Sequence, residues 1–115
     1  MRVLVCGGRK YNNYINIEEE LNQINRLNSI DCVIEGGYTG ADNLAKQWAK
    51  TNGINVEEYK PDWDKYGLAA GPIRNTQMLD EGKPDLVVAF LGGAGTADMV
   101  IKAERAGIKV IKNEN

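Results

Sequence analysis

Hydrophobic residues of this chain follow a pattern that occurs three times: a short apolar run ends in glycines, and an amphipathic stretch follows. Each occurrence predicts a strand that leads through a loop into a helix. Two further apolar runs, Asn55 to Tyr59 and Ile108 to Lys112, predict additional strands. The three runs and their glycine clusters are Met1 to Cys6 with Gly7-Gly8, Asp31 to Glu35 with Gly36-Gly37-Tyr38-Thr39-Gly40, and Asp85 to Leu91 with Gly92-Gly93-Ala94-Gly95-Thr96.

Capping signals predict where the helices begin and end. Asn16 followed by Glu19 indicates a capping box, so we expect a helix from this point with an apolar stripe that includes Ile17, Leu21 and Ile24. The other helices are expected from Gly40-Ala41-Asp42 to Asn52-Gly53, from Gly71-Pro72 to just before Gly82, and from an N-cap at Thr96 to Gly107.

The alternation of strands and helices is typical of a parallel sheet covered on both faces. We predict an α/β fold: one domain over residues 1–115, built as a minimal Rossmann-like three-layer sandwich with a five-stranded parallel sheet in the order 3-2-1-4-5. Trp48, Met78 and Leu79 are interpreted as packing residues. The segment Lys60 to Ala70 is predicted to be a long connection, and such connections often line sites.

The amino-acid composition excludes several classes of function. The formal net charge is -2 over 115 residues, so no basic field is available for duplex nucleic acid. No apolar run approaches the ~20 residues of a membrane span, and we expect a cytoplasmic protein without membrane association. Histidine is absent, which excludes histidine-based nucleophile pairs, and Cys6 and Cys32 alone cannot complete a zinc site. Both cysteines are interpreted as buried reduced thiols, and no metal or cofactor is predicted.

The glycine clusters carry the prediction of a ligand. In open parallel sheets, ligands bind beyond the carboxyl ends of the strands, near the point where the strand order reverses. Glycine lets backbone N–H groups approach a ligand, and the helix start that follows adds partial positive charge, so the favoured ligand is a phosphate-bearing small molecule. Neither a GxGxxG nor a GxxxxGK[ST] motif is present, which argues against nicotinamide dehydrogenases and P-loop ATPases.

Polar and aromatic residues flank these loops. Arg9 and Arg74 suit phosphate, although a surface ion pair is the alternative for Arg74. Asp42 and Asp98 suit ribose hydroxyls, and the alternative for both is complementation of a helix dipole. Tyr38, Trp63 and Tyr66 offer flat faces to a base, with a core position as the alternative for Trp63. The predicted ligand-binding residues are Gly7, Gly8, Arg9, Gly36, Gly37, Tyr38, Gly40, Ala41, Asp42, Trp63, Arg74, Asn75, Gly92, Gly93, Ala94, Gly95 and Thr96.

A series of motifs also resembles a known family. They are Arg2-Val-Leu-Val-Cys-Gly-Gly-Arg9, Gly36-Gly-Tyr-Thr-Gly-Ala-Asp42, Asp62-Trp63, Ala70-Gly-Pro-Ile-Arg-Asn75 and Pro84-Asp-Leu-Val-Val-Ala-Phe-Leu-Gly-Gly-Ala-Gly-Thr-Ala-Asp98. Together they resemble the YspA/YpsA-related branch of the SLOG superfamily, named after the Smf/DprA and LOG proteins. The resemblance covers nearly the whole chain in the right order. It implies a Rossmann-like domain, often encoded by bacteria or phages, that binds nucleotides, nucleotide sugars or related signalling molecules.

The resemblance also implies where this chain departs from the LOG enzymes, which cleave the N-glycosidic bond of nucleoside monophosphates. Their signature PGGxGTxxE matches Gly92, Gly93, Gly95 and Thr96, but its proline is Leu91 and its catalytic glutamate falls on Met99. The related branch commonly carries arginine at the position of Ala94. Arg74 is the analogue of an arginine in the LOG enzymes' MxxRK helix.

Three functional hypotheses follow. The first is a binding module that senses or sequesters a nucleotide-derived ligand such as a mononucleotide, ADP-ribose or a cyclic relative. The second is a LOG-like nucleoside 5'-monophosphate phosphoribohydrolase, in which Asp98 or Asp42 stabilises the ribosyl centre, and Arg74 with the Gly92 to Thr96 loop holds the phosphate. The third, DprA-like binding of single-stranded DNA, is disfavoured by the net charge. Because LOG-type relatives are dimers, a homo-oligomer is expected.

Overall fold

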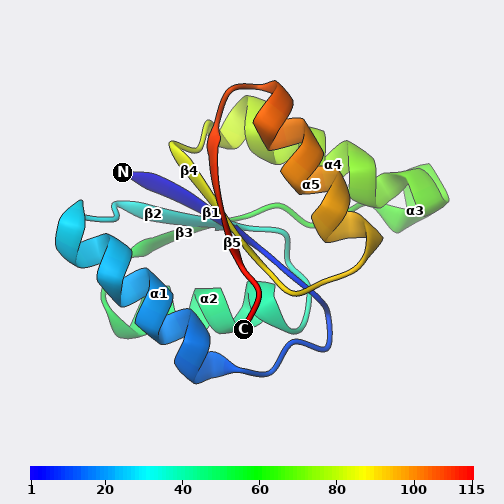
Figure 1. The fold of residues 1–115 in the computed structure, drawn as a ribbon. Coiled ribbons are helices and arrows are strands. Elements are labelled where there is room, and N and C mark those ends of the chain that lie inside the picture. The colour runs from blue at the N-terminus through cyan, green and yellow to red at the C-terminus, as the bar shows by residue number, and fades with distance from the viewer.

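Five parallel strands form a single sheet in the order β3-β2-β1-β4-β5. The computed structural model describes residues 1–115 (Figure 1). The predicted α/β class and the predicted strand order are therefore confirmed. The strands are β1 Arg2–Cys6, β2 Cys32–Glu35, β3 Asn55–Glu58, β4 Leu86–Phe90 and β5 Lys109–Asn113.

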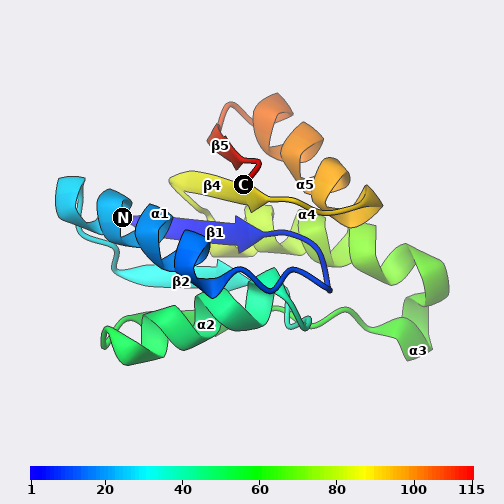
Figure 2. The same cartoon turned by 60° about the horizontal axis from the view of Figure 1, so that its bottom comes forward.

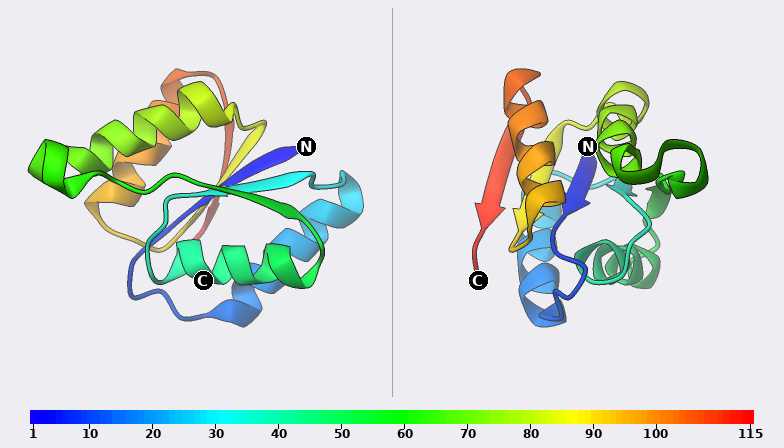
Figure 3. Two further views of the ribbon diagram at one scale, coloured as in Figure 1. Left: turned by 180° about the vertical axis from the view of Figure 1, so that it is seen from behind. Right: turned by 90° about the vertical axis from the view of Figure 1, so that its right-hand side faces the viewer.

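The helices form a layer on each face of the sheet. α1 and α2 cover one face, and α4 and α5 cover the other (Figures 1 and 3). In length and apolar character, every helix falls short of what crossing a bilayer requires. The helices are α1 Tyr14–Leu27, α2 Ala41–Thr51, α3 Trp63–Tyr66, α4 Ala70–Gly82 and α5 Ala94–Arg105, and a 3-10 turn spans Gly67–Ala69.

Alternating strand residues supply the two halves of the core. Val3 and Val5 of β1 face α1 and α2, whereas Leu4 and Cys6 face α4 and α5. Because the central strands are covered on both faces, β4 is buried along its whole length. The central strands β1, β2 and β4 therefore appear as nearly continuous apolar runs in the sequence, whereas the edge strands β3 and β5 carry polar residues.

The residues interpreted as packing residues lie inside this core. Trp48 is fully buried, and its Nε1 donates to Oδ1 of Asn22 at 2.9 Å. Met78 is buried, and Leu79 packs against the same cluster. The buried-thiol interpretation is confirmed for both cysteines, and burial raises the pKa of Cys6 to about 12. At neutral pH this thiol carries its proton and is a poor nucleophile.

Two predicted helix starts are wrong. α1 begins at Tyr14, because Asn13 is its N-cap and accepts the N–H of Asn16 at 3.1 Å. Asn16 is buried inside the helix and donates to the hydroxyl of Tyr11 and to Asn113 of β5. α5 begins at Ala94, because Gly93 occupies the N-cap position predicted for Thr96. In both cases the side chain taken for a cap lies in the first turn of the helix.

The connection from Lys60 to Ala70 is more ordered than predicted. α3 and the 3-10 turn occupy most of it, and Asp62 caps α3 by accepting the N–H of Lys65 at 3.1 Å. Figure 2 shows α3 beyond the carboxyl ends of the strands, on the side toward which β1 points. This short helix therefore extends α4 past the edge of the sheet where the glycine loops lie.

The glycine loops at that edge are in direct contact. The N–H of Gly8 donates to the carbonyl of Leu91 at 2.8 Å, and the carbonyl of Gly8 accepts the N–H of Ala41 at 3.2 Å. Gly40 has a φ of 76°, and a Cβ atom at this position would overlap the carbonyl of Gly8. The loop after β1 is thus held between the loop after β4 and the start of α2.

We expect the substitution Gly40→Ala to lower the free energy of unfolding by more than about 2 kcal/mol, through positive-φ strain and overlap with Gly8. The matched control is Gly53→Ala, since Gly53 has a φ of 67° but open space around its Cα. That control should cost only about 1 kcal/mol. Urea denaturation of both variants measures the difference, and equal losses would show that the contact between the loops is not tight.

Candidate functional site

The glycine loops, α3 and the start of α4 enclose a cavity of about 380 Å³. It lies at the carboxyl ends of the central strands. Figure 2 shows that α3 lies beyond this edge of the sheet. Its lining residues are Cys6, Gly7, Gly8, Arg9, Tyr38, Asp42, Trp63, Leu68, Gly71, Pro72, Arg74, Asn75, Met78, Gly93, Ala94, Gly95, Thr96 and Asp98.

Most predicted ligand-binding residues line this cavity, but five of them do not. Gly36, Gly37, Gly40, Ala41 and Gly92 are absent from its surface. A Cβ atom at Gly36 would overlap the guanidinium of Arg74, and one at Gly92 would overlap the hydroxyl of Thr96. Gly36 and Gly92 therefore allow the loops to pack against Arg74 and Thr96.

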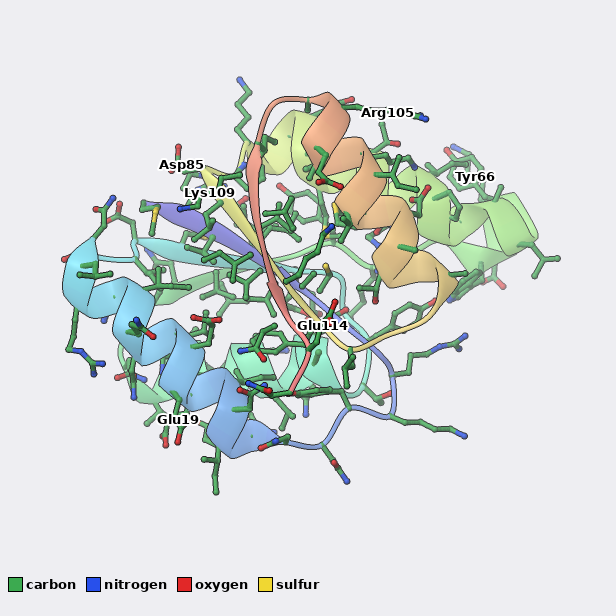
Figure 4. The ribbon with its side chains drawn as sticks, viewed as in Figure 1. Glu19, Tyr66, Asp85, Arg105, Lys109 and Glu114 are labelled. Carbon is green, nitrogen blue, oxygen red and sulfur yellow. The ribbon has the colours of Figure 1, made fainter.

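Several lining residues were not predicted. Cys6, Leu68, Gly71, Pro72 and Met78 contribute apolar surface. Cys6 and Met78 are buried residues whose sequence context indicates only a core position. Tyr66, which was predicted as a possible stacking surface, does not line the cavity and lies at the outer end of the molecule on α3 (Figure 4).

The first turn of α5 borders the cavity with unpaired amides. The N–H groups of Ala94, Gly95 and Thr96 have no acceptor inside the helix, and no loop carbonyl or capping side chain accepts from them. No atom lies within 4 Å of a Cβ built at Gly93 or Gly95. The guanidinium-bearing side chain of Arg9 lines the same cavity. An anion can approach these donors closely, and the helix dipole favours negative charge there.

Arg74 lies between this helix start and the end of β2. It is only 6% exposed and forms no ion pair, so the alternative of a surface ion pair is wrong. Its Nη1 donates to the carbonyls of Gly36 and Tyr59, and its Nε donates to Oδ1 of Asn75 at 3.1 Å. Nη2 has no acceptor in the protein. Burial lowers the pKa of Arg74, and the nearby carboxyl of Asp42 opposes this shift.

Both the oxygen and the nitrogen of the Asn75 side-chain amide are hydrogen-bonded within the protein. Its Oδ1 accepts from Arg74, and its Nδ2 donates to the carbonyl of Gly95 at 3.1 Å and to Oδ2 of Asp98 at 2.9 Å. The same Asp98 oxygen lies 3.0 Å from the Nζ atom of Lys102. Asn75 thus connects the buried Arg74 to the first turn of α5. The Asp98 carboxylate accepts a hydrogen bond from Asn75 and forms an ion pair with Lys102.

Asp42 adds a buried carboxyl to the cavity. It is 5% exposed, and its Oδ2 accepts the N–H of Tyr38 at 3.3 Å. Burial raises the pKa of Asp42 to about 6, against the opposing effects of the backbone hydrogen bonds and of Arg74. The position in the first turn of α2 suits the helix dipole, and the same carboxyl also faces the cavity.

Two aromatic rings form the outer wall. The ring centroids of Tyr38 and Trp63 are 6.0 Å apart, with an angle of 31° between the planes. The Cζ atoms of Arg9 and Arg74 lie 5.1 Å and 5.0 Å from the centroid of the Tyr38 ring. Trp63 is 43% exposed, so it is not a core residue. Its position leaves ring surface free for a planar group.

Comparison with known proteins identifies the family. A model described as the YspA, cpYpsA-related SLOG family matches residues 1–66, more than half of the chain. The chain belongs to this SLOG family. It is also similar to the Gene 61 protein of Mycobacterium phage D29, with 35% identity over 118 residues that cover 96% of this chain and 94% of that protein.

The position equivalent to the LOG glutamate is part of the core in this SLOG protein. Met99 is fully buried against the face of the sheet covered by α4 and α5, together with Leu4 and Met78. Asp98, one residue earlier, lines the cavity instead. An apolar side chain therefore lies where the LOG signature has its acid. Separately, no group of three or more Cys, Asp or Glu side chains is arranged to hold a metal ion.

We expect Asn75→Ala to destabilise the fold by about 2 kcal/mol, because it leaves Arg74 Nε without its acceptor and the α5 turn without its link. Thr76→Ala is the matched control, since the exposed Thr76 hydroxyl bonds only to the carbonyl of Pro72. The control should change the free energy of unfolding by less than about 1 kcal/mol. Chemical denaturation compares the two, and an Asn75→Ala variant as stable as the control would show that the network contributes little.

Proposed function

We propose that this SLOG protein binds a nucleotide-derived, phosphate-bearing small ligand, such as a mononucleotide, ADP-ribose or a cyclic relative. The supporting observation is that a single cavity combines a helix start with free amides, a buried arginine and a partly exposed aromatic wall. A phosphate and a base are the two groups that such a combination binds.

The phosphate is assigned to the first turn of α5. There the amides of Ala94, Gly95 and Thr96 can donate to its oxygens, and the Arg9 side chain can add a charge-assisted hydrogen bond. Arg74 contributes through its positive charge and through Nη2, because its other donors are bound to Gly36, Tyr59 and Asn75. A buried guanidinium that is already held in place loses little entropy when an anion arrives.

The base is assigned to the exposed face of Trp63, beside Tyr38. Stacking on an aromatic side chain tolerates any base, so this wall provides affinity without selecting among purines and pyrimidines. The Asp42 carboxyl, located in the same cavity, is the acceptor available to ribose hydroxyls.

Hydrolysis of the N-glycosidic bond is the second candidate function. It is favoured by Asp42, a cavity carboxyl with a pKa raised to about 6 that can exchange a proton near neutral pH. Two observations favour binding without cleavage. Met99 replaces the acid of the LOG signature with an apolar side chain, and Asp98 is held by Asn75 and Lys102.

Incubation with a mixture of mononucleotides, NAD, ADP-ribose and cyclic ADP-ribose isomers tests the proposal. Mass spectrometry of the protein-bound fraction should detect an intact phosphate-bearing species, and the supernatant should contain no excess of free base. Accumulation of free base together with ribose phosphate would instead establish the hydrolase. If no phosphate-bearing species is retained or consumed, the cavity is not a nucleotide site.

A charge placed in the first turn of α5 tests the position of the phosphate. Gly95→Asp should abolish binding of the retained ligand, with a loss of at least about tenfold in affinity, because the new carboxylate repels the phosphate. It should leave the fold stable, since Gly95 is exposed with open space around it and Asp suits a helix start.

The matched control is Ala97→Asp. Ala97 is exposed, lies on the same helix and borders a groove between α5 and β5, and it does not line the cavity. Isothermal titration should show nearly unchanged affinity for this control. Equal losses in both variants would mean that the first turn of α5 does not hold the phosphate.

A further inference from the structure

The last residue of β2 is a glutamate that the proposed ligand site does not use. Glu35 is 1% exposed, and its Oε1 accepts the N–H of Gly37 at 2.7 Å. Its Oε2 is also buried and has no hydrogen-bond partner. An ionised carboxylate with an unpartnered buried oxygen is costly, whereas a protonated carboxyl can use that oxygen as a donor if an acceptor lies nearby.

The acceptor is Glu58 on the adjacent strand. Glu35 and Glu58 are register partners in β2 and β3, so their side chains extend from neighbouring positions on one face of the sheet. A hydrogen bond between the two carboxyls is among the causes that shift both of their pKa values. Lys46 Nζ lies 3.1 Å from Oε2 of Glu58, and Lys60 Nζ lies 3.5 Å from its Oε1. The two lysines keep Glu58 ionised, which leaves Glu35 as the partner that carries the proton.

Charged groups from each neighbouring element act on this pair. The Asp42 carboxyl on α2 opposes ionisation of Glu35, and the Arg74 guanidinium on α4 favours it. Burial is the largest effect, followed by the hydrogen bond with Glu58, and the pKa of Glu35 is raised to about 8. The pKa of Glu58 is lowered, with the hydrogen bond from Glu35 as the largest cause.

The pair supports one wall of the cavity. Between Glu35 and Tyr38 the backbone is fixed at three consecutive residues: the Gly36 carbonyl accepts from Arg74, the Gly37 N–H donates to Glu35, and the Tyr38 N–H donates to Asp42. We call residues 36–38 the wall segment. It carries the Tyr38 ring next to the guanidinium of Arg74, and the Gly37 N–H joins it directly to the Glu35 carboxyl.

We propose that Glu35 holds the proton of a carboxyl–carboxylate hydrogen bond to Glu58, and that loss of this proton displaces the wall segment and weakens ligand binding. The proton passes to solvent, and two adjacent carboxylates remain that repel each other. Nucleotide affinity would therefore fall under mildly alkaline conditions. The part of this inference that concerns affinity rests on the proposed function, whereas the location of the proton does not.

The location of the proton is tested without ligand. In the full chain labelled with carbon-13 at the glutamate carboxyl groups, the Glu35 resonance should titrate with a midpoint near pH 8 and the Gly37 amide should shift with the same midpoint. In Glu58→Gln the midpoint should move toward the ordinary value for glutamate, because the neighbouring charge is removed. A wild-type Glu35 that is already ionised at pH 6 would overturn the proposal.

The dependence of thermal stability on pH provides a second test of the Glu35 proton, because the direction of the change can be predicted. Since the folded-state pKa of Glu35 is raised from 4.5 to about 8, the native chain keeps a proton that the unfolded chain releases. The stability that this retained proton adds to the native chain is fully present below the unfolded-state pKa of Glu35. It is lost as the pH rises from the unfolded-state pKa to the folded-state pKa. Relative to Glu35→Gln, which stays uncharged, the wild-type melting temperature should fall between pH 5 and pH 8 and then level off. A constant difference between the two proteins would contradict the assignment.

The effect on affinity is tested with AMP at pH 7 and pH 9. Wild-type affinity should fall by about fivefold or more, the lower range of typical coupling between sites, whereas Glu35→Gln should change by less than about twofold. Glu19→Gln, an exposed position on the outer side of α1, is the control and should behave as the wild type (Figure 4). Equal pH dependence in wild type and Glu35→Gln would overturn the coupling. Absence of binding by AMP and by every other member of the nucleotide mixture described above, together with a Glu35 midpoint near pH 8, would contradict the proposed function and leave the proton assignment standing.

Discussion

The site depends on the buried guanidinium of Arg74. Through Gly36 and Tyr59 it fixes the ends of β2 and β3, and through Asn75 it reaches the first turn of α5. Few other groups could do this, because a planar guanidinium offers donors in several directions from one rigid position. Hydrogen bonds to the carbonyls of Gly36 and Tyr59 and to Asn75 offset part of the free-energy cost of burying the charge. The Nη2 atom of Arg74 remains without an acceptor, and Arg74 lines the cavity. This buried and hydrogen-bonded cation thus lies beside the cavity in which we propose that a phosphate binds.

This arrangement separates residues that shape the cavity from those that would contact a ligand. Gly40, Gly36 and Gly92 allow the loops to pack, whereas the amides after Gly93 and the ring of Trp63 remain free. The protein belongs to the YspA, cpYpsA-related SLOG family, and its fold places the glycine loops at the switch point of the sheet. Met99 in the core distinguishes its cavity from that expected of a LOG-type hydrolase.

Sequence reasoning predicted the sheet because buried parallel strands leave apolar runs that end in glycine. It placed the caps of α1 and α5 wrongly, because Asn13 and Asn16, or Gly93 and Thr96, are equally acceptable caps until tertiary contacts decide between them. Glu35 was missed for a related reason. A glutamate at a strand end is ordinarily exposed, and only the pairing of β2 with β3 reveals that it is buried beside Glu58.

The central claim is that one cavity holds the phosphate at the first turn of α5 and the base at Trp63. Two-dimensional NMR of the labelled chain during titration with AMP tests it most directly. The account predicts that the largest shifts occur at the amides of Ala94, Gly95 and Thr96 and at the indole N–H of Trp63, and that the amides of α1 do not respond. Shifts confined to another surface, or no shifts at millimolar AMP, would contradict it.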